Sequence, residues 1–128
     1  MRLPLHTRSL ILEAETAAGH ARFRISGEYD VRDLERMIPA MLEETVRQGV
    51  ERAYIDITPM TGELPDFDRY NLAEMFVQHW GVKRRAAIQV DTIRQRVNKL
   101  FENVAVNRSG QVLVGDRPED LLAWLMKD

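Results

Sequence analysis

The chain of 128 residues carries 18 Lys+Arg against 20 Asp+Glu, has a formal net charge of -2, and contains no cysteine. There is therefore no basic excess for binding DNA or RNA, and disulfides, thiolate zinc sites and cysteine nucleophiles are excluded. The composition, 45% hydrophobic and 30% charged, predicts a single globular domain over residues 1–128. No apolar run approaches the roughly 20 residues of a membrane span, and no signal peptide is recognisable, so we expect a cytoplasmic protein without a transmembrane segment.

Two apolar segments near the start of the chain predict a pair of antiparallel strands. They cover residues 9–16 and 21–27, and the connection between them is short enough to reverse the chain. In the second segment Ala21, Phe23 and Ile25 alternate with polar residues, which is typical of a strand with one buried face. We therefore expect Phe23 to lie in the core.

The first amphipathic helix is predicted to begin after Asp30, a favoured N-cap residue. The apolar residues that follow lie within an arc of roughly 140° at 100° per residue. Pro39 lies inside this helix and has no backbone donor, so we expect a kink or a restart near it. Gly49 is predicted to end the helix.

A central strand and a second helix are predicted next. Residues 53–57 form a nearly unbroken apolar run, as in a strand covered on both faces. Asp66 is predicted to cap the second helix, and Gly81 to end it. The core-facing residues of this helix are expected to be Leu72, Ala73, Phe76, Val77 and Trp80.

The remaining elements follow the same alternation. Residues 86–90 and 111–114 predict two further strands, and Asp91 is expected to cap the helix between them. Asp116 and Glu119 have the spacing of a capping box at the start of a short terminal helix. The core stripe predicted for the third helix consists of Ile93, Val97, Leu100, Phe101 and Val104.

The order of these elements is β-β-α-β-α-β-α-β-α, which predicts an α/β fold. We expect a five-stranded, mostly parallel sheet with an antiparallel first strand. Right-handed crossovers would place helices on both faces of this sheet.

This order, together with four strings, resembles the SpoIIAA-like group of the STAS (sulfate transporter and anti-sigma factor antagonist) superfamily, whose fold is shared with CRAL-TRIO lipid-binding domains. The strings are YIDI at residues 54–57, VKRRAA at 82–87, ENVAVNR at 102–108 and AWL at 123–125. The resemblance covers about residues 9–125. It implies a bacterial β-α superhelix without established catalysis, used in protein regulation or in holding apolar ligands.

The resemblance also directs attention to the segment after the central strand. Anti-sigma factor antagonists carry a phosphorylatable serine there, in an Asp-Ser-Ser-Gly-like turn at the start of a helix, where the free N–H groups stabilise phosphate. In this chain only Thr61 and Gly62 match that turn, and Glu63 adds a like charge before Pro65. This departure argues against a phosphorylation switch at Thr61.

No residue pattern in the sequence identifies a catalytic, metal or cofactor site. The three histidines, His6, His20 and His79, lack metal-ligand spacing, and a role of His79 at a helix C-terminus is favoured over one as a general base. Asp56 and Asp91 follow two strands at the edge where α/β sheets place ligands. They are either an acid–base pair or, as we favour, a loop-ordering residue and a helix cap.

The segment around the second helix has more apolar residues than one sheet contact requires. Phe67 and Met75 fall off the core stripe, and Met60 and Leu64 lie in the preceding loop. Such side chains could close over an apolar ligand, form a partner surface, or complete the core. The candidate ligand-binding residues are Thr58, Met60, Thr61, Leu64, Phe67, Met75 and Asp91.

Two other features concern partners. The terminal helix has apolar residues around most of its circumference, among them Leu121, Trp124 and Leu125. This surplus predicts a homodimer interface, unless these side chains are buried against the sheet. The basic residues 83–85, together with Arg94, Arg96 and Lys99 on the next helix, could face an anionic lipid headgroup or an acidic partner, but a solvated helix face is favoured.

The sequence therefore predicts a non-catalytic module that regulates or binds other proteins. The alternative is a protein that binds or carries an apolar or lipid-like small molecule at the carboxyl ends of the strands. An enzyme using Asp56, Asp91 or His79 is the third and least favoured hypothesis.

Overall fold

The computed structural model describes residues 3–128, apart from the side chains of residues 95–97. The strands in this part of the chain are β1 (Leu5–His6), β2 (Leu10–Ala17), β3 (His20–Glu28), β4 (Arg52–Asp56), β5 (Met60–Thr61), β6 (Arg85–Gln89) and β7 (Gln111–Gly115). The helices are α1 (Val31–Arg47), α2 (Asp66–Trp80), α3 (Thr92–Asn107) and α4 (Pro118–Leu125).

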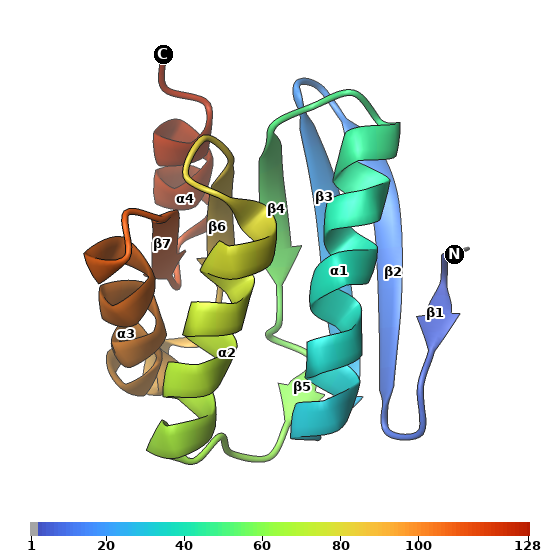
Figure 1. The fold of residues 1–128 in the computed structure, drawn as a ribbon, viewed down its shortest axis with the longest axis vertical. Helices are drawn as coiled ribbons and strands as arrows, with labels where there is room; N and C mark the ends of the chain where they lie inside the picture. The colour runs from blue at the N-terminus through green and yellow to red at the C-terminus, as the bar shows by residue number, and fades with distance from the viewer. Residues whose placement is uncertain (1–2) are drawn as a thin grey trace.

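All of these strands belong to one sheet, in the order β1-β2-β3-β4-β6-β7, with β5 paired to the end of β3 (Figure 1). β2 is antiparallel to β1 and β3, whereas β3, β4, β6 and β7 are parallel. The predicted α/β fold is confirmed, and its five strands correspond to β2, β3, β4, β6 and β7. β1 and β5 have only two residues each, too few to leave a periodic pattern in the sequence.

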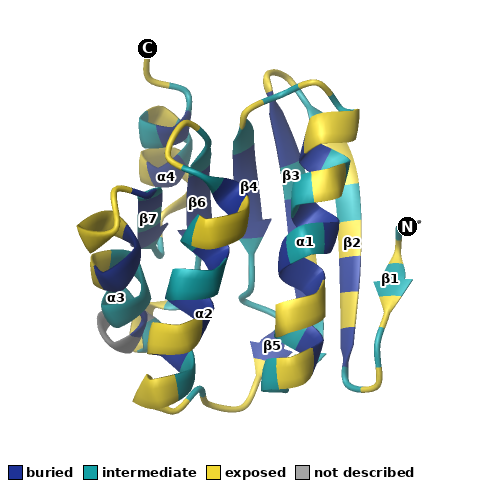
Figure 2. Cartoon of the chain, in the orientation of Figure 1, coloured by how far each residue is buried: buried dark blue, intermediate teal, exposed yellow. Residues whose placement is uncertain are grey.

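The main core lies between one face of the sheet and the helices α1, α2 and α3. Phe23 of β3 is buried there, as predicted, and buried and exposed residues alternate along β2 (Figure 2). On α2 the rings of Phe76 and Trp80 stack with centroids 4.9 Å apart. Burying a side chain of this size contributes roughly 1.5–3 kcal/mol, so this layer dominates the stability of the fold.

A second, smaller core lies on the opposite face, beneath α4. Tyr54 of β4 and Ala87 of β6 point to this side and pack against Leu121 and Leu125 of α4. The Tyr54 hydroxyl donates a hydrogen bond to Gln89 at 2.7 Å. Helices therefore cover both faces of the sheet, as expected from the sequence.

Helix α1 confirms two of its three predicted features. The Asp30 carboxylate accepts a hydrogen bond from the N–H of Asp33 at 3.1 Å, and Gly49 follows the C-cap with a φ of 74°, a conformation that favours glycine. The expected restart at Pro39 is not found, because one helix runs through this residue, and a kink there stays a prediction. Proline leaves the carbonyl of Glu35 without its helical donor, but Glu35 is exposed and its carbonyl can bind water.

The predicted cap of α2 is wrong. Pro65 occupies the N-cap position, and the helix begins at Asp66 itself without a side-chain cap. The Asp66 carboxylate instead binds the guanidinium of Arg69, one turn along, at 3.0 Å. A carboxylate within the first turn still interacts favourably with the helix dipole.

The predicted capping box of α4 is also wrong. Arg117 occupies the N-cap position without a side-chain cap, so the hydroxyl or carboxylate oxygen that a capping box needs is missing there. Asp116 precedes that position by one residue. Pro118 begins the helix, where its missing N–H costs nothing.

The predicted core stripe of α3 is wrong at its first residue. Ile93 is 90% exposed, because it lies in the first turn of the helix, at the edge of the sheet rather than over it. Farther along, Phe101 is half-buried and Val104 is 6% exposed, so the stripe reaches the core only from the middle of the helix. The side chain of Val97 lies outside the described residues.

Candidate functional site at the carboxyl edge of the sheet

The segment after β4 is held at the carboxyl edge of the sheet by local hydrogen bonds. The Asp56 carboxylate accepts hydrogen bonds from the backbone N–H and the hydroxyl of Thr58, at 2.9 and 2.7 Å, which turns the chain at the strand end. β5 then pairs with β3, and the Arg94 guanidinium of α3 donates a hydrogen bond to the Met60 carbonyl at 2.5 Å. This segment is thus fixed between β3 and α3.

Asp91 caps α3 as the sequence predicts. Its Oδ1 accepts a hydrogen bond from the N–H of Arg94 at 2.8 Å, and its Oδ2 lies 3.5 Å from Nε of the same arginine. Because Asp56 is bonded to Thr58, both carboxylates have the structural partners that the favoured interpretation gave them. Their contacts give no support to an acid–base pair.

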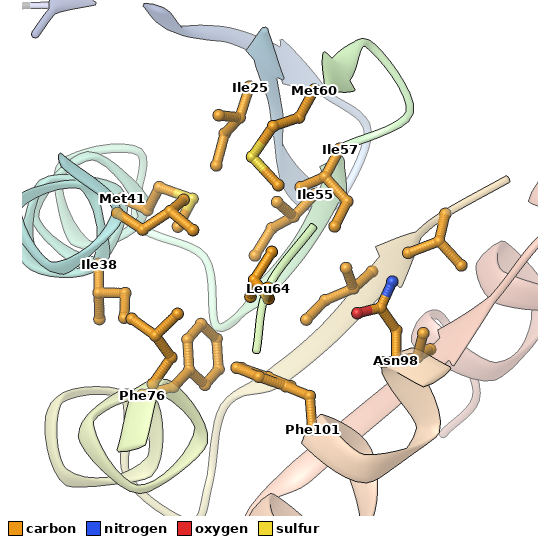
Figure 3. A pocket seen from close by; sticks show the side chains of 15 residues that line it. Ile25, Ile38, Met41, Ile55, Ile57, Met60, Leu64, Phe76, Asn98 and Phe101 are labelled. Carbon is orange, nitrogen blue, oxygen red and sulfur yellow. The ribbon is translucent and has the colours of Figure 1, made fainter. Parts of the chain in front are cut away.

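An apolar cavity of about 80 Å³ lies beside this segment, between the sheet and helices α1, α2 and α3. Among the described residues that line it, Asn98 is the one polar residue, and Met60 and Leu64 line it as well. In Figure 3, Leu64 lies at the centre of the ring of lining side chains, with Phe76 and Phe101 close to it in the view. Ordinary small-molecule sites occupy roughly 300–1,000 Å³, so a lipid-sized molecule does not fit unless the lining moves.

A cleft of about 320 Å³ adjoins this cavity at the carboxyl edge. The cleft and the cavity share four lining residues: Ile57, Met60, Leu64 and Asn98. The cleft adds the guanidinium groups of Arg69 and Arg94 and the exposed side chain of Ile93. We call it the arginine cleft. Unlike the cavity, it combines apolar walls with charged side chains: the two arginines and Glu63.

Arg69 is a buried cation that connects α2 to α3. Its side chain is 9% exposed; Nε donates a hydrogen bond to Oδ1 of Asn98 at 3.1 Å, and Nη1 donates one to Oδ1 of Asp66 at 3.0 Å. The Asp66 side chain is 82% exposed, so water weakens this ion pair. A desolvated guanidinium therefore lines the cleft while its counter-charge lies in solvent, an arrangement that favours a further negative group.

Most of the predicted ligand-binding residues lie outside both hollows. Met60 and Leu64 line the cavity and the cleft, whereas Thr58 and Asp91 are occupied by the local bonds described above. The five residues that line neither hollow are Thr58, Thr61, Phe67, Met75 and Asp91. Met75 is half-buried against the core, and Phe67 is 75% exposed.

Two polar members of the cleft, Arg69 and Asn98, are not indicated by the sequence analysis, whereas Arg94 belongs to the basic concentration described there. Arg69 lies three residues before Leu72 on the buried side of α2, and an arginine on a core-facing stripe is a signal that could have identified it. The partnership of Arg69 with Asn98 could not be found in this way, because it joins two helices that are brought together only by packing.

Thr61 belongs to β5 and not to the first turn of a helix. Its side chain is exposed, and its hydroxyl donates a hydrogen bond to the Gly27 carbonyl at 3.3 Å. A phosphate on this residue would not meet the free N–H groups of a helix N-terminus, which agrees with the expectation against a phosphorylation switch.

The predicted interface residues of the terminal helix are largely used within the chain. Leu121 and Leu125 are buried against Tyr54 and Ala87, so they are not available to a second subunit. Trp124 is half-buried against the same cluster. Burial against the sheet, the alternative weighed for this helix, accounts for most of its apolar surface, and a homodimer interface remains a prediction only for Trp124.

Two of the basic residues at the start of β6, Arg84 and Arg85, bind backbone carbonyls near helix C-termini. Arg84 donates a hydrogen bond to the carbonyl of Trp80 at 3.1 Å, at the end of α2. Arg85 donates one to the Leu125 carbonyl at 3.3 Å and another to the carbonyl of Lys127, at the end of α4. Because these carbonyls carry partial negative charge, they account for Arg84 and Arg85 without a lipid headgroup. Lys99 likewise donates a hydrogen bond to the Val114 carbonyl at 2.6 Å, and the side chain of Arg96 lies outside the described residues.

Two tyrosines, the half-buried Tyr29 and the buried Tyr54, act as hydrogen-bond donors and not as bases. Burial, followed by the hydrogen bond to Asp68 at 2.8 Å, raises the pKa of Tyr29 far above its ordinary value. Burial likewise raises the pKa of Tyr54. Both hydroxyls therefore stay protonated at neutral pH.

Within residues 3–128, no group of three or more His, Asp or Glu side chains is arranged to hold a metal ion. In the same part of the chain, no helix is long and apolar enough to cross a membrane. His79 is exposed in the last turn of α2, where the helix dipole favours a cation.

Comparison with known proteins identifies the fold. No protein-family model and no curated protein matches the chain. An anti-sigma factor antagonist from Mycobacterium paratuberculosis is structurally similar, with a TM-score of 0.62 and 14% identity over 94% of this chain and 98% of that one. An uncharacterised protein of the DUF3478 family with a SpoIIAA-like fold, from Shewanella loihica PV-4, has a TM-score of 0.56 and 22% identity over 97% and 99%. At these identities the likeness establishes a SpoIIAA-like fold.

Proposed function

We propose that this chain, which has the SpoIIAA-like fold, is a regulatory module that acts by binding another protein and has no catalytic activity of its own. One solved structure with this fold is an anti-sigma factor antagonist, which is a regulatory protein. At the carboxyl edge the contacts of Asp56 and Asp91 are structural and Tyr29 remains protonated, which favours a role without catalysis.

The observation that carries the proposal is a pair of exposed apolar side chains at the carboxyl edge. Phe67 is 75% and Ile93 is 90% exposed, in the first turns of two helices that pack against each other. Large apolar side chains exposed together on a surface mark interaction sites more often than isolated ones do. We call Phe67, Ile93 and the acidic residues Glu63 and Asp66 the carboxyl-edge surface.

The charges of this surface define the partner that it fits. Glu63 and Asp66 are both exposed beside Phe67 in the chain, and Asp68 on its other side is partly exposed. An aromatic side chain among carboxylates is complementary to an apolar pocket with a basic rim. We therefore expect the partner to present lysine or arginine around the site that receives Phe67.

The test is to identify partners by cross-linking in cells and to measure the affinity of each for purified variants. Phe67→Ser and Ile93→Ser should each weaken binding by about tenfold or more, as expected for anchors at the centre of an interface. The matched control is Val46→Ser, an exposed apolar residue at the far end of α1, which should bind like wild type. Equal affinities for all three variants, or no partner that binds the purified chain, would contradict the proposal.

A second candidate function, binding of an apolar or lipid-like small molecule, is favoured by the apolar cavity and the adjoining cleft. Outward movement of Leu64, which lines both, would join them into one site. Native mass spectrometry of freshly purified protein tests this function and the predicted homodimer together. An adduct that is lost on denaturation supports ligand binding, whereas a dimer that is lost in Trp124→Ser supports the interface at Trp124. A bare monomer contradicts both.

A further inference from the structure

We propose that the arginine cleft binds the carboxylate of a small amphipathic molecule, and that the apolar part of this ligand lies against Ile57, Met60 and Leu64. The inference rests on the second candidate function, for which it names the ligand class. It is tested without a protein partner: Glu63 and Ile93 belong both to the cleft and to the carboxyl-edge surface, whereas Phe67 does not line the cleft.

The donors for a carboxylate come from the two arginines that line the cleft. Nε and Nη1 of Arg69 bond to Asn98 and Asp66, while Nη1 of Arg94 bonds to the Met60 carbonyl. Within the described residues, Nη2 of neither arginine has a hydrogen-bond partner. Guanidinium N–H groups match the geometry of a carboxylate, and such charge-assisted hydrogen bonds are about twice as strong as neutral ones.

The surrounding acidic groups limit the ligand to one negative charge. Asp66 lies 3.0 Å from Arg69, and Asp91 lies 3.5 Å from Arg94, so each guanidinium is already partly neutralised. Glu63 also lines the cleft. A phosphate monoester carries roughly -1.5 to -2 at neutral pH and would be repelled more strongly than a carboxylate by these three groups.

The wall of the cleft opposite the arginines is apolar, so we expect the ligand to have an apolar part. Ile57, Met60 and Leu64 line the cleft and continue into the apolar cavity, and Ile93 flanks the cleft with an exposed side chain. The cleft volume of about 320 Å³ lies at the lower end of the range for small-molecule sites. Burial of an alkyl chain against these residues would contribute about 0.8 kcal/mol per methylene, which acetate cannot obtain.

Calorimetric titration with octanoate at pH 7 tests the proposal, with octanol, acetate and octyl phosphate as comparison ligands. Octanoate should saturate the protein with a Kd of about 1 mM or lower, and each comparison ligand should bind at least tenfold more weakly. Arg94→Gln should weaken octanoate binding about tenfold without changing the response to octanol. Arg36→Gln, an exposed arginine of α1, is the matched control and should bind octanoate like wild type.

Leu64→Ala keeps both arginines but removes part of the apolar wall, so it should weaken octanoate binding by about tenfold, and equal or tighter binding would overturn the placement of the alkyl chain. This variant keeps the proposal testable if Arg94→Gln does not fold. Absence of saturable octanoate binding by wild type, tighter binding of octanol or octyl phosphate, or unchanged affinity in a folded Arg94→Gln would overturn the proposal. A neutral adduct in native mass spectrometry would support small-molecule binding while overturning the carboxylate assignment.

Discussion

Alanine substitutions of Ile93 and Val104 provide a direct test of how α3 is placed on the sheet. The two residues belong to the same apolar stripe in the sequence, yet Ile93 is 90% and Val104 is 6% exposed. If burial and not sequence periodicity sets the energetic contribution of a side chain, the two substitutions should have very different effects on the free energy of unfolding.

The expected magnitudes follow from the groups removed. Val104→Ala deletes two buried methyl groups at about 0.8 kcal/mol each and leaves a small cavity, so the expected loss of stability is about 2 kcal/mol. Ile93→Ala deletes groups that are already in water and introduces a better helix former, so the expected change is within about 0.5 kcal/mol.

Urea unfolding followed by far-UV circular dichroism measures both free energies under identical conditions. Similar slopes with denaturant for the two variants would show that only stability has changed. A loss in Ile93→Ala as large as that in Val104→Ala would refute the placement of the first turn of α3. If that loss also grew with protein concentration, a second copy of the chain would be covering Ile93.

Two further substitutions test local geometry and a titrating group. A Cβ at Gly27, where φ is 113°, would overlap the Ser9 carbonyl oxygen, whereas a Cβ at Gly49 meets nothing within 4 Å. Gly49→Ala should therefore cost only the backbone strain of a positive φ, about 1 kcal/mol. Gly27→Ala should lower the thermal midpoint much more. Tyr29→Phe removes the hydrogen bond to Asp68 and should cost about 1 kcal/mol at pH 7. Because the pKa of Tyr29 is raised in the folded state, stability should be retained below about pH 10 and fall above it. Urea midpoints between pH 8 and 11 should show a shallower decline in Tyr29→Phe, and an unchanged decline would contradict this account.

Local patterns in the sequence determined the order of the elements and much of the fold. The alternation at Phe23, the caps at Asp30 and Asp91, and the helix end at Gly49 were predicted because each depends on backbone geometry within a few residues. The turn after β4 belongs to the same class, since Asp56 bonds to a residue two positions away. The sequence also predicted the apolar residues Met60 and Leu64 at the site.

Only the tertiary structure decided which side chains meet and which remain in water. Periodicity gives the direction of a side chain around its helix but not where the helix ends lie relative to the sheet, so the exposure of Ile93 could not be predicted. The arginine cleft likewise depends on α2 and α3 packing side by side, which brings Arg69 to Asn98 across 29 positions of sequence. Leu121 is buried because α4 packs against the face of β4 and β6 that carries Tyr54 and Ala87. Contacts between distant segments arise from how whole surfaces fit, and no local pattern encodes that fit.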